Sequence, residues 1–424
     1  MTKTQAKLPQ GKAYIWFSLG SIANALSSFI LLMVVTRTLG SVAGGIFSIA
    51  FALSYQFSIL GHFEMRPLQA TDIEEKYSFG TYLGSRIVTC LLMMVCIVAF
   101  ALYTNGFTSD SLVIILISSM KFFDSFEDVF HGLYQQKDRV DLSGKSFFFR
   151  IVISTLCFCL LVVLSHDLVI SASVTCLASL IAMLAINVPL THKFTSLKPS
   201  FEIKPLAGLL LSSLPLFIGA FLFGAIVNAP RFGIELWLTK EDQVFFACLF
   251  MPTMVINLLS GFIFKPLLTS LSQHWAQRNY RQFASLIIKS TGIVTGGTVL
   301  AFLIALPFGT AILSWIYGIN LTPYTPELLV LLFGGFLSAL SMILSYIIIT
   351  MRKQGLIIIA YIVSGLSCIL AAYPCIALFK LMGAALLYNI SLCMLCVSFI
   401  VIIFFSIAQG LKKDASSKLT ISEQ

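Results

Sequence analysis

Apolar stretches separated by short polar segments fill the chain from end to end. Each stretch has the ~20 residues that an α-helix needs to cross about 30 Å of hydrocarbon. The pattern therefore predicts an all-α integral membrane protein with about twelve transmembrane helices. The predicted spans are residues 13–35, 43–63, 80–103, 111–133, 146–165, 168–190, 206–228, 243–264, 286–306, 326–350, 355–379 and 381–407.

The fourth stretch differs from the others because ionisable side chains share one of its faces: Lys121, Asp124, Glu127, Asp128 and His131. These five fall within an arc of about 120° when a helix advances by about 100° per residue. Phenylalanines occupy the opposite side. A charge at the centre of a membrane helix costs on the order of 2.5 kcal/mol or more. The pattern therefore predicts a transporter in which these groups pair with one another or face a hydrophilic path.

Two interpretations of this charged face stay open. In the first it handles substrate and ions, with Lys121 as the main substrate-binding candidate and Asp124, Glu127 and Asp128 as ion-coupling groups. Three carboxylates this close cannot all stay ionised without cations, so either one of them is protonated or a cation is bound. In the second, the face is an internal salt-bridge lattice, with Lys121 paired to Asp124 or Ser125, its neighbours on the helix. We favour the first.

The chain is predicted to be a duplication of six helices. Met65-Arg66-Pro67-Leu68 ends the second span, and Phe264-Lys265-Pro266-Leu267 ends the eighth. Arg37 follows the first span and Arg231 follows the seventh, at nearly the same separation. The predicted domains are two six-helix bundles, 1–200 and 201–409, and a disordered cytoplasmic tail, 410–424. An even number of helices gives both halves the same orientation in the membrane. The longest expected loops, 265–285 and 307–325, are too short for a soluble domain.

Four arginines are further substrate-binding candidates. Arg86 and Arg150 lie about one turn inside the cytoplasmic boundary, where a guanidinium suits phosphate or, equally well, anionic lipid headgroups. Arg37 and Arg231 lie at matched outer positions, where they either form a cationic mouth or extend to headgroups. Asparagines in or near the spans either line the path or hydrogen-bond between helices: Asn24, Asn187, Asn228 and Asn257.

Composition supports the membrane assignment, because 58% of residues are hydrophobic and only 11% are charged. The net charge of +9 arises mainly from basic residues in the loops and tails of one side. By the positive-inside rule this places both termini in the cytoplasm, and the charge reflects topology rather than nucleic-acid binding. Lys3, Lys7 and Lys12 precede the first stretch, which is too long for a signal peptide and lacks a small-residue cleavage site. We expect an uncleaved first helix.

Several kinds of chemistry have no residues to support them in the sequence. There is no nucleotide-binding loop of the form G-x-x-x-x-G-K-[ST], so ATP hydrolysis is not expected. The ten cysteines lie in apolar stretches without polar partners, which favours packing over metal or redox roles. No catalytic residue, metal ligand or cofactor is assigned, and we do not expect an enzyme. Glycines spaced by four residues are expected to pack helices within a monomer.

Two regions resemble polysaccharide flippases of the multidrug/oligosaccharidyl-lipid/polysaccharide exporter superfamily. Residues 20–48 resemble the opening of these proteins, from GSIANAL to TRTLGSVAGGIFS. Residues 126–135 (FEDVFHGLYQ) resemble their fourth helix, with the following loop represented by Arg139, Asp141, Lys145, Ser146 and Arg150. The resemblance implies a MATE-like fold in a bacterial inner membrane.

The same resemblance implies that the substrate is a polyprenyl-pyrophosphate-linked oligosaccharide repeat unit for O-antigen, capsule or exopolysaccharide. On this hypothesis Arg86 and Arg150 bind the pyrophosphate inside, Lys121 guides it at mid-membrane, and Arg37 and Arg231 lie near its release. The carboxylates would take up H⁺ or Na⁺ to reset the transporter. Membrane lipid is a partner, and a polysaccharide polymerase complex is a further candidate partner.

Two alternatives are weaker. A cation-coupled multidrug antiporter would favour an acidic, aromatic cavity for organic cations, and Lys121 argues against it. A membrane-embedded polysaccharide polymerase would need a substantial outer loop with catalytic acids or arginines, and the outer loops are short.

Overall fold

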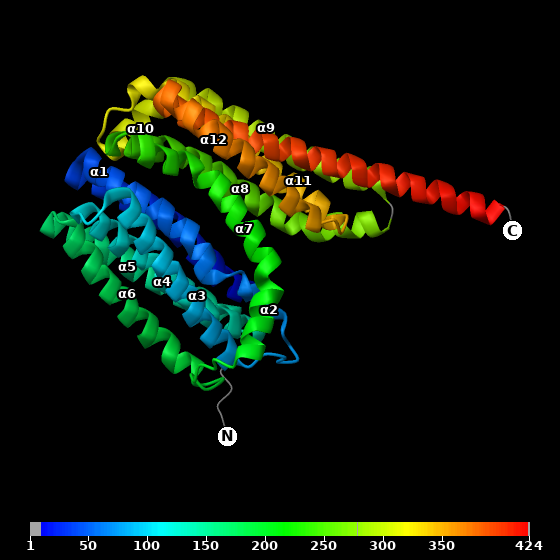
Figure 1. Cartoon of the computed structure of the whole chain (residues 1–424), viewed down its shortest axis with the longest axis horizontal. Coiled ribbons are helices and arrows are strands. Elements are labelled where there is room, and N and C mark those ends of the chain that lie inside the picture. Colours follow the sequence, from blue (N-terminus) through cyan, green and yellow to red (C-terminus); the bar gives the residue numbers. More distant parts are fainter. Residues whose placement is uncertain (1–9, 278, 423–424) are drawn as a thin grey trace. The chain divides into compact units, whose positions relative to one another are not determined.

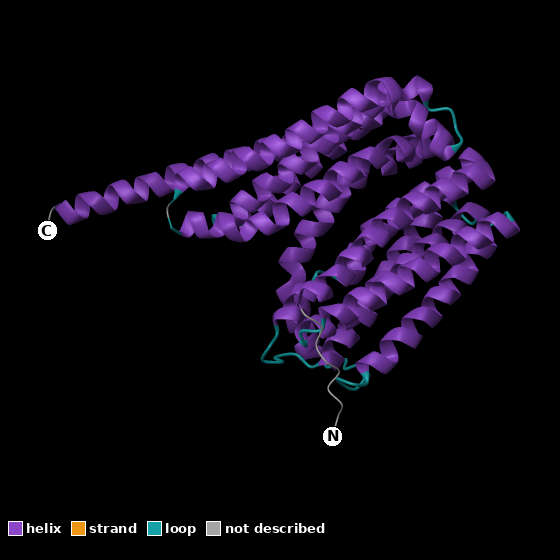
Figure 2. Ribbon diagram, turned by 180° about the vertical axis from the view of Figure 1, so that it is seen from behind, coloured by secondary structure: helices purple, strands orange, loops and turns teal. Residues whose placement is uncertain are grey.

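The computed structural model describes residues 10–277 and 279–422, and this part of the chain consists of helices joined by loops (Figure 2). Its side chains are described between residues 15 and 406, apart from those of residues 262, 265, 266, 269 and 278. The side chains of Lys3, Lys7, Lys12 and Lys265, which entered the sequence argument, lie outside the described residues.

The first compact unit comprises the chain up to Gly224 with two short later segments, Thr239–Val244 and Ile316–Ile319. Its helices are α1 (Gln10–His62), α2 (Met65–Thr71), α3 (Phe79–Asn105), α4 (Ser109–Gln136), α5 (Val140–Ser165) and α6 (Leu168–Thr191). α7 (Ile203–Trp237) begins in this unit. We refer to it as unit 1.

Three of these helices begin at a polar N-cap residue. Ser78 accepts a hydrogen bond from the backbone N–H of Thr81 at the start of α3, and Thr108 accepts one from Ser111 at the start of α4. Asp167 accepts two at the start of α6. Each cap satisfies a backbone donor that the first turn of a helix leaves unpaired, and such a cap contributes about 1 kcal/mol.

α4 lies at the centre of unit 1. It contacts α1, α2, α3, α5 and α6, and Figure 1 shows it among these helices. The most extensive packing is between α1 and α5, where Gly144 lies against the backbone of Trp16 and Phe17 and leaves no room for a Cβ. The charged face of α4 is therefore enclosed by other helices of the same unit.

The backbone departs from helical geometry at two places in this region: at Gly40 inside α1, and at Phe63 and Glu64 just after its end. Gly40 has φ 87° and ψ −177°, a conformation that glycine adopts far more readily than other residues, and it separates the two predicted spans within α1. Phe63 and Glu64 both have positive φ, 48° and 49°, and turn the chain from α1 into the short α2. Phe63 is buried in its left-handed conformation, and its ring stacks on Phe217 with centroids 4.3 Å apart.

The second compact unit, unit 2, comprises Ala225–Leu238, Phe245–Trp315 and the chain from Asn320 onward. It contains most of α8 (Lys240–Ala276), α9 (Tyr280–Ile304), a π-helical turn (Ala305–Gly309), most of α10 (Thr310–Tyr317), a 3₁₀ turn (Thr322–Tyr324), α11 (Thr325–Thr350) and α12 (Gly355–Ser422). α12 has one non-helical residue, Lys380, with φ 50° and ψ −124°. This corner separates two predicted spans, as Gly40 does in α1.

Two expectations about loops differ from the structure. The loop expected at 265–285 is mostly helix, because α8 continues through Ala276. Its apolar residues Phe264, Leu267 and Leu271 recur at helical spacing and extend the helix beyond the predicted span. α12 is helical through Ser422, whereas the sequence predicts a disordered tail over 410–424.

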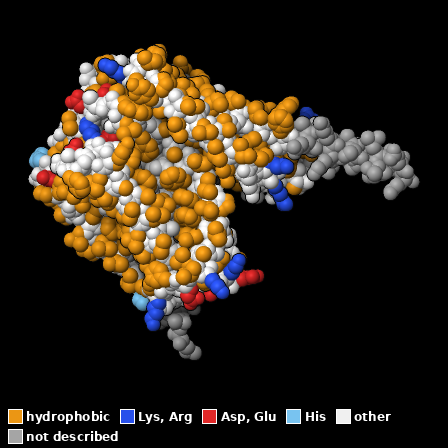
Figure 3. Space-filling model, in the orientation of Figure 1, with side chains coloured by type: hydrophobic (Ala, Val, Ile, Leu, Met, Phe, Trp, Pro, Cys, Tyr) orange, Lys and Arg blue, Asp and Glu red, His pale blue; other side chains and the backbone are white. Residues whose placement is uncertain are grey.

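The fold is that of an all-α membrane protein, as predicted. Nine helices in the described residues are long and apolar enough to cross a membrane, and α4 is not among them because of its charges. Hydrophobic side chains cover most of the face drawn in Figure 3, and charged side chains gather near its edges. The exact number of twelve transmembrane helices stays a prediction.

Candidate functional site

A cavity of about 180 Å³ lies inside unit 1, against the charged face of α4. Residues of α1, α2, α4 and α5 line it: Phe17, Asn24, Tyr55, Ser58, His62, Arg66, Lys121, Asp124, Asp128, His131, Ser143 and Phe147. Two cations, Lys121 and Arg66, therefore share this cavity with two carboxylates.

Lys121 is held in the cavity wall by three partners. Its Nζ lies 2.5 Å from Oδ2 of Asp124 and donates to Oδ1 of Asn24 on α1 at 3.1 Å. The ammonium also lies over the ring of Tyr55, 4.6 Å from its centroid, in a cation–π contact. The pairing of Lys121 with Asp124, predicted from their spacing on the helix, is confirmed, and Asn24 hydrogen-bonds between helices.

The other oxygen of Asp124 pairs with Arg150 of α5. Arg150 Nη2 lies 2.6 Å from Oδ1 of Asp124, and Arg150 Nε donates to Oε2 of Glu127. The guanidinium of Arg150 is fully buried and does not line the cavity. It therefore links two carboxylates of α4 from behind the cavity wall.

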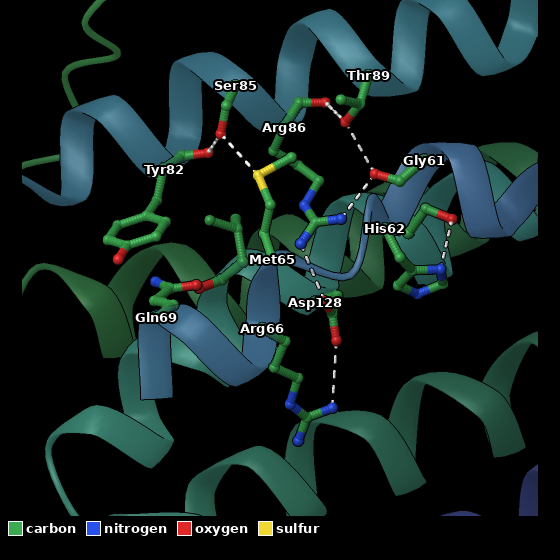
Figure 4. A network of polar contacts seen from close by, with 12 residues as sticks. Gly61, His62, Met65, Arg66, Gln69, Tyr82, Ser85, Arg86, Thr89 and Asp128 are labelled. Atoms are coloured by element: carbon green, nitrogen blue, oxygen red, sulfur yellow. Dashed lines mark hydrogen bonds and ion pairs between the residues drawn. The ribbon is translucent and has the colours of Figure 1, made fainter. Parts of the chain in front are cut away.

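Asp128, one turn beyond Asp124, is also held by two cations (Figure 4). Arg86 Nη2 on α3 lies 2.9 Å from its Oδ2, and Arg66 Nη1 on α2 lies 3.2 Å from its Oδ1. Arg86 also donates through Nη1 to the carbonyl oxygen of Gly61 at 2.6 Å, near the end of α1. Arg86 is fully buried, whereas Arg66 reaches the cavity.

Glu127 is fully buried and lies in a network between α4, α5 and α6 that Arg150 joins to Asp124. Its Oε1 accepts hydrogen bonds from Ser146 Oγ at 2.5 Å and from Asn187 Nδ2 at 2.8 Å. His131 Nε2 lies 3.5 Å from the same oxygen. Asn187 thus hydrogen-bonds between helices, one of the two roles expected for it.

The three carboxylates on the charged face of α4 are matched by four cations of the chain: Lys121, Arg66, Arg86 and Arg150. The cations expected beside these carboxylates are therefore supplied by α4 itself, through Lys121, and by the neighbouring helices α2, α3 and α5. Removing one partner of such a buried pair costs about 3–5 kcal/mol, because it leaves a charge uncompensated. The salt-bridge lattice is present, and four of its members, Lys121, Arg66, Asp124 and Asp128, line the cavity, where a ligand could contact them.

The structure separates the predicted site residues into three groups. Lys121, Asp124 and Asp128 line the cavity, whereas Arg86, Arg150 and Glu127 lie behind its wall. Arg37 and Arg231 are not at the cavity. Arg37, in unit 1, is exposed and donates from Nε to the carbonyl oxygen of Ile316 at 2.6 Å. Arg231, in unit 2, is buried with its guanidinium 4.9 Å from the centroid of the Phe250 ring.

Arg66, His62 and Tyr55 are cavity residues that the sequence argument did not assign to the site. From the sequence, Arg66 counts among the basic residues that set the orientation of the chain in the membrane. Its signal in the sequence is the motif of a basic residue followed by Pro-Leu at 66–68, with a counterpart at 265–267. This motif does not show where the basic side chain points. His62 contacts the carbonyl oxygen of Ser58 through Nδ1 at 2.6 Å.

Comparison with known proteins identifies the family and supports the fold. Residues 11–272 match the protein family described as "Polysaccharide biosynthesis protein". The chain is similar to the capsular polysaccharide biosynthesis protein CapF of Staphylococcus aureus, with 23% identity over 387 residues that cover 90% of this chain and 96% of CapF.

Solved structures with a similar fold include flippases and transporters. The lipid II flippase MurJ in an inward closed conformation has a TM-score of 0.67 and 13% identity, covering 92% of this chain and 91% of MurJ. An inward-facing multidrug resistance MATE family transporter of the MOP superfamily has a TM-score of 0.63 and 13% identity, covering 95% of this chain and 99% of that one. These likenesses confirm the resemblance inferred from residues 20–48 and 126–150. The chain belongs to the polysaccharide biosynthesis protein family.

Proposed function

We propose that this protein translocates polyprenyl-pyrophosphate-linked oligosaccharide repeat units across the bacterial cytoplasmic membrane by alternating access. The units would serve O-antigen, capsule or exopolysaccharide synthesis. The family and the likeness to CapF support the link to polysaccharides, and the fold shared with MurJ and MATE proteins supports transport rather than an enzyme reaction.

The observation that carries the proposal is the cavity containing Lys121 and Arg66 within an apolar bundle. A lysine ammonium is a compact charge with three donors, and an arginine guanidinium presents a planar fork that suits phosphate oxygens. Both cations already bind oxygen anions here, since each pairs with an aspartate of α4. The site therefore has the chemistry to receive the charged pyrophosphate of a lipid carrier.

The size of the cavity limits what it holds in this conformation. Its volume of about 180 Å³ is below the range of about 300–1,000 Å³ that is usual for small-molecule pockets. It accommodates a charged group but not a chain of several sugar rings. We assign the pyrophosphate to this cavity and expect the sugars to lie outside it.

The remaining predicted roles are adjusted to the geometry. Arg86 and Arg150 are occupied by carboxylates, so we assign them to holding Asp124, Asp128 and Glu127 rather than to touching substrate. Contacts of Arg37 and Arg231 near release stay predictions, as do action as a monomer and a polymerase partner. Uptake of H⁺ or Na⁺ by the carboxylates also stays a prediction, and it would require their cations to move away first.

The test follows lipid-linked oligosaccharide in cells lacking this protein and determines which leaflet holds it. We expect accumulation on the cytoplasmic leaflet, reversed by the wild-type protein but not by Lys121→Ala. Lys137→Ala is the matched control, because Lys137 pairs with Glu75 in a loop outside the cavity.

Other outcomes would overturn parts of the proposal. Full transport by Lys121→Ala would remove Lys121 from the mechanism. No accumulation, combined with greater sensitivity to cationic drugs, would support the multidrug antiporter. Accumulation of unpolymerised units on the outer leaflet would support the polymerase.

A further inference from the structure

We propose that Asp124 and Asp128 compete with the substrate's pyrophosphate for Lys121 and Arg66, and that this competition promotes release. The inference rests on the proposed function, and it assigns to the two aspartates a role as internal substitutes for the substrate anion. Arg86 and Arg150 become positioning residues that hold both aspartates in place while the cations in the cavity change partner.

The evidence is an arrangement that occurs twice, one turn apart on α4. Asp124 uses one carboxylate oxygen for Arg150 at 2.6 Å and the other for Lys121 at 2.5 Å. Asp128 uses one oxygen for Arg86 at 2.9 Å and the other for Arg66 at 3.2 Å. Each aspartate thus bridges a cation behind the wall to a cation in the cavity, as Figure 4 shows for Asp128.

The two cations of each bridge differ in accessibility. The side chains of Arg86 and Arg150 are each 1% exposed, whereas those of Lys121 and Arg66 are 10% and 25% exposed. An anion entering the cavity therefore meets Lys121 and Arg66 and not the two arginines behind the wall. The exchangeable half of each bridge is the half that faces the cavity.

Exchange of partners leaves each aspartate beside one buried arginine, which Asp124 shares with Glu127. If Lys121 turns to a phosphate oxygen, Asp124 keeps Arg150; if Arg66 turns, Asp128 keeps Arg86. An uncompensated buried charge would cost several kcal/mol, and this design avoids it. Glu127 provides the contrast on the same helix, because its guanidinium partner Arg150 lies behind the cavity wall with Ser146 and Asn187. Its neighbour on the cavity side is His131, whose Nε2 lies 3.5 Å from Glu127 Oε1, and not Lys121 or Arg66.

The physical reason for such a device lies in the requirements of transport. A site must bind strongly enough to accept its cargo and weakly enough to release it. Two cations alone in an apolar bundle would hold a pyrophosphate tightly, since charge-assisted hydrogen bonds are strong in a low dielectric. A carboxylate already beside each cation replaces the phosphate as it leaves, which lowers its affinity and speeds its exit.

The experiment measures binding of a sugar-free polyprenyl pyrophosphate to the full-length protein in lipid nanodiscs, together with its flipping rate. The variants are Asp124→Asn and Asp128→Asn. We expect each to bind the probe more tightly, by about tenfold, equivalent to roughly 1.4 kcal/mol, and to flip it more slowly. The control is Asp141→Asn, because Asp141 pairs with Arg139 at 2.8 Å and 3.0 Å and is not part of the cavity wall.

Binding by the aspartate variants that is weaker than or equal to wild type would overturn the inference and leave the proposed function standing. A wild-type protein that binds no polyprenyl pyrophosphate would overturn both.

Asp124→Asn is expected to fold, because Arg150 keeps Glu127 and Lys121 keeps Asn24. If neither variant is monodisperse, an infrared difference spectrum of the wild-type protein with and without inorganic pyrophosphate tests the same point. Shifted carboxylate stretching bands would support partner exchange. Unshifted carboxylate bands in a protein that binds pyrophosphate would overturn it.

Discussion

Unit 1 and unit 2 differ in the number of charged side chains that they bury between their helices. Unit 1 encloses three carboxylates and their four cations around α4, with a cavity that two of the cations reach. In the described part of unit 2, Arg231 is the one charged residue among the buried side chains. A small pocket there is lined almost entirely by apolar residues: Phe264, Leu267, Leu271, Ile287, Ser290, Ile343 and Tyr346. Among the described residues, the buried cluster of opposite charges therefore belongs to unit 1.

The repeated basic-Pro-Leu motif shows the same divergence in the backbone. In unit 1 the helix ends before the motif, at Phe63 and Glu64, and α2 places Arg66 at the cavity. In unit 2 the matching residues 265–267 lie inside the continuous helix α8. Similar sequence at matched positions therefore does not give similar geometry, because the left-handed residues that precede it decide the direction of the chain.

Among the changes that test this difference between the two units, we expect Arg150→Ala to have the largest effect on stability. Asp124 would lose one cation and Glu127 would lose its guanidinium, at a cost of about 3–5 kcal/mol. We expect a marked loss of thermal stability in detergent, followed by circular dichroism. Arg281→Ala, at an exposed position of unit 2, should change stability by about 0.5 kcal/mol or less. Equal melting temperatures for the two variants would show that the lattice of unit 1 is not structural.

The contrast is sharpened by placing a new carboxylate in each unit. Ser290→Asp would add a charge to the apolar pocket of unit 2 and cost on the order of 2.5 kcal/mol or more. Ser143→Asp should cost less, because Ser143 Oγ already lies 3.5 Å from Arg66 Nη2 in the cavity of unit 1. Melting curves of both variants measure the difference. If Ser143→Asp is the more damaging change, the cavity does not accept further negative charge.

We expect the smallest changes in stability at the two non-helical residues inside helices, Gly40 in α1 and Lys380 in α12. Gly40→Ala should destabilise by about 1 kcal/mol, because its φ of 87° disfavours any side chain even though nothing lies within contact of a Cβ there. Lys380→Gly should stabilise by about the same amount, since Lys380 adopts φ 50° and ψ −124°. Melting temperatures that move in opposite directions would support the explanation, and a shift of the same sign for both would refute it.

The features that depend on helix periodicity could be predicted from the sequence. The all-α membrane fold follows from the apolar stretches, and the charged face of α4 follows from spacing at about 100° per residue. The pairing of Lys121 with Asp124 needs only a spacing of three residues within one helix. All three are found in the structure.

The partners that come from other helices could not be predicted. Arg150 meets Asp124 and Glu127 because α5 packs on α1 and α4 in one register, which depends on close contacts such as that at Gly144. Arg66 reaches Asp128 because two non-glycine residues adopt a left-handed conformation, which no local pattern in the sequence indicates. Such contacts are determined by tertiary packing rather than by local propensity.

The charges of α4 also have a consequence for how the protein is made. Lys121, Asp124 and Asp128 each add about 2.5–3.5 kcal/mol to the cost of inserting a helix into the bilayer when they lie near its centre, so α4 is costly to insert on its own. Its compensating arginines lie on the helices synthesised immediately before and after it, Arg86 on α3 and Arg150 on α5. The cost of inserting α4 is therefore lower when α3 and α5 lie beside it, and we expect insertion of the three helices to be coupled.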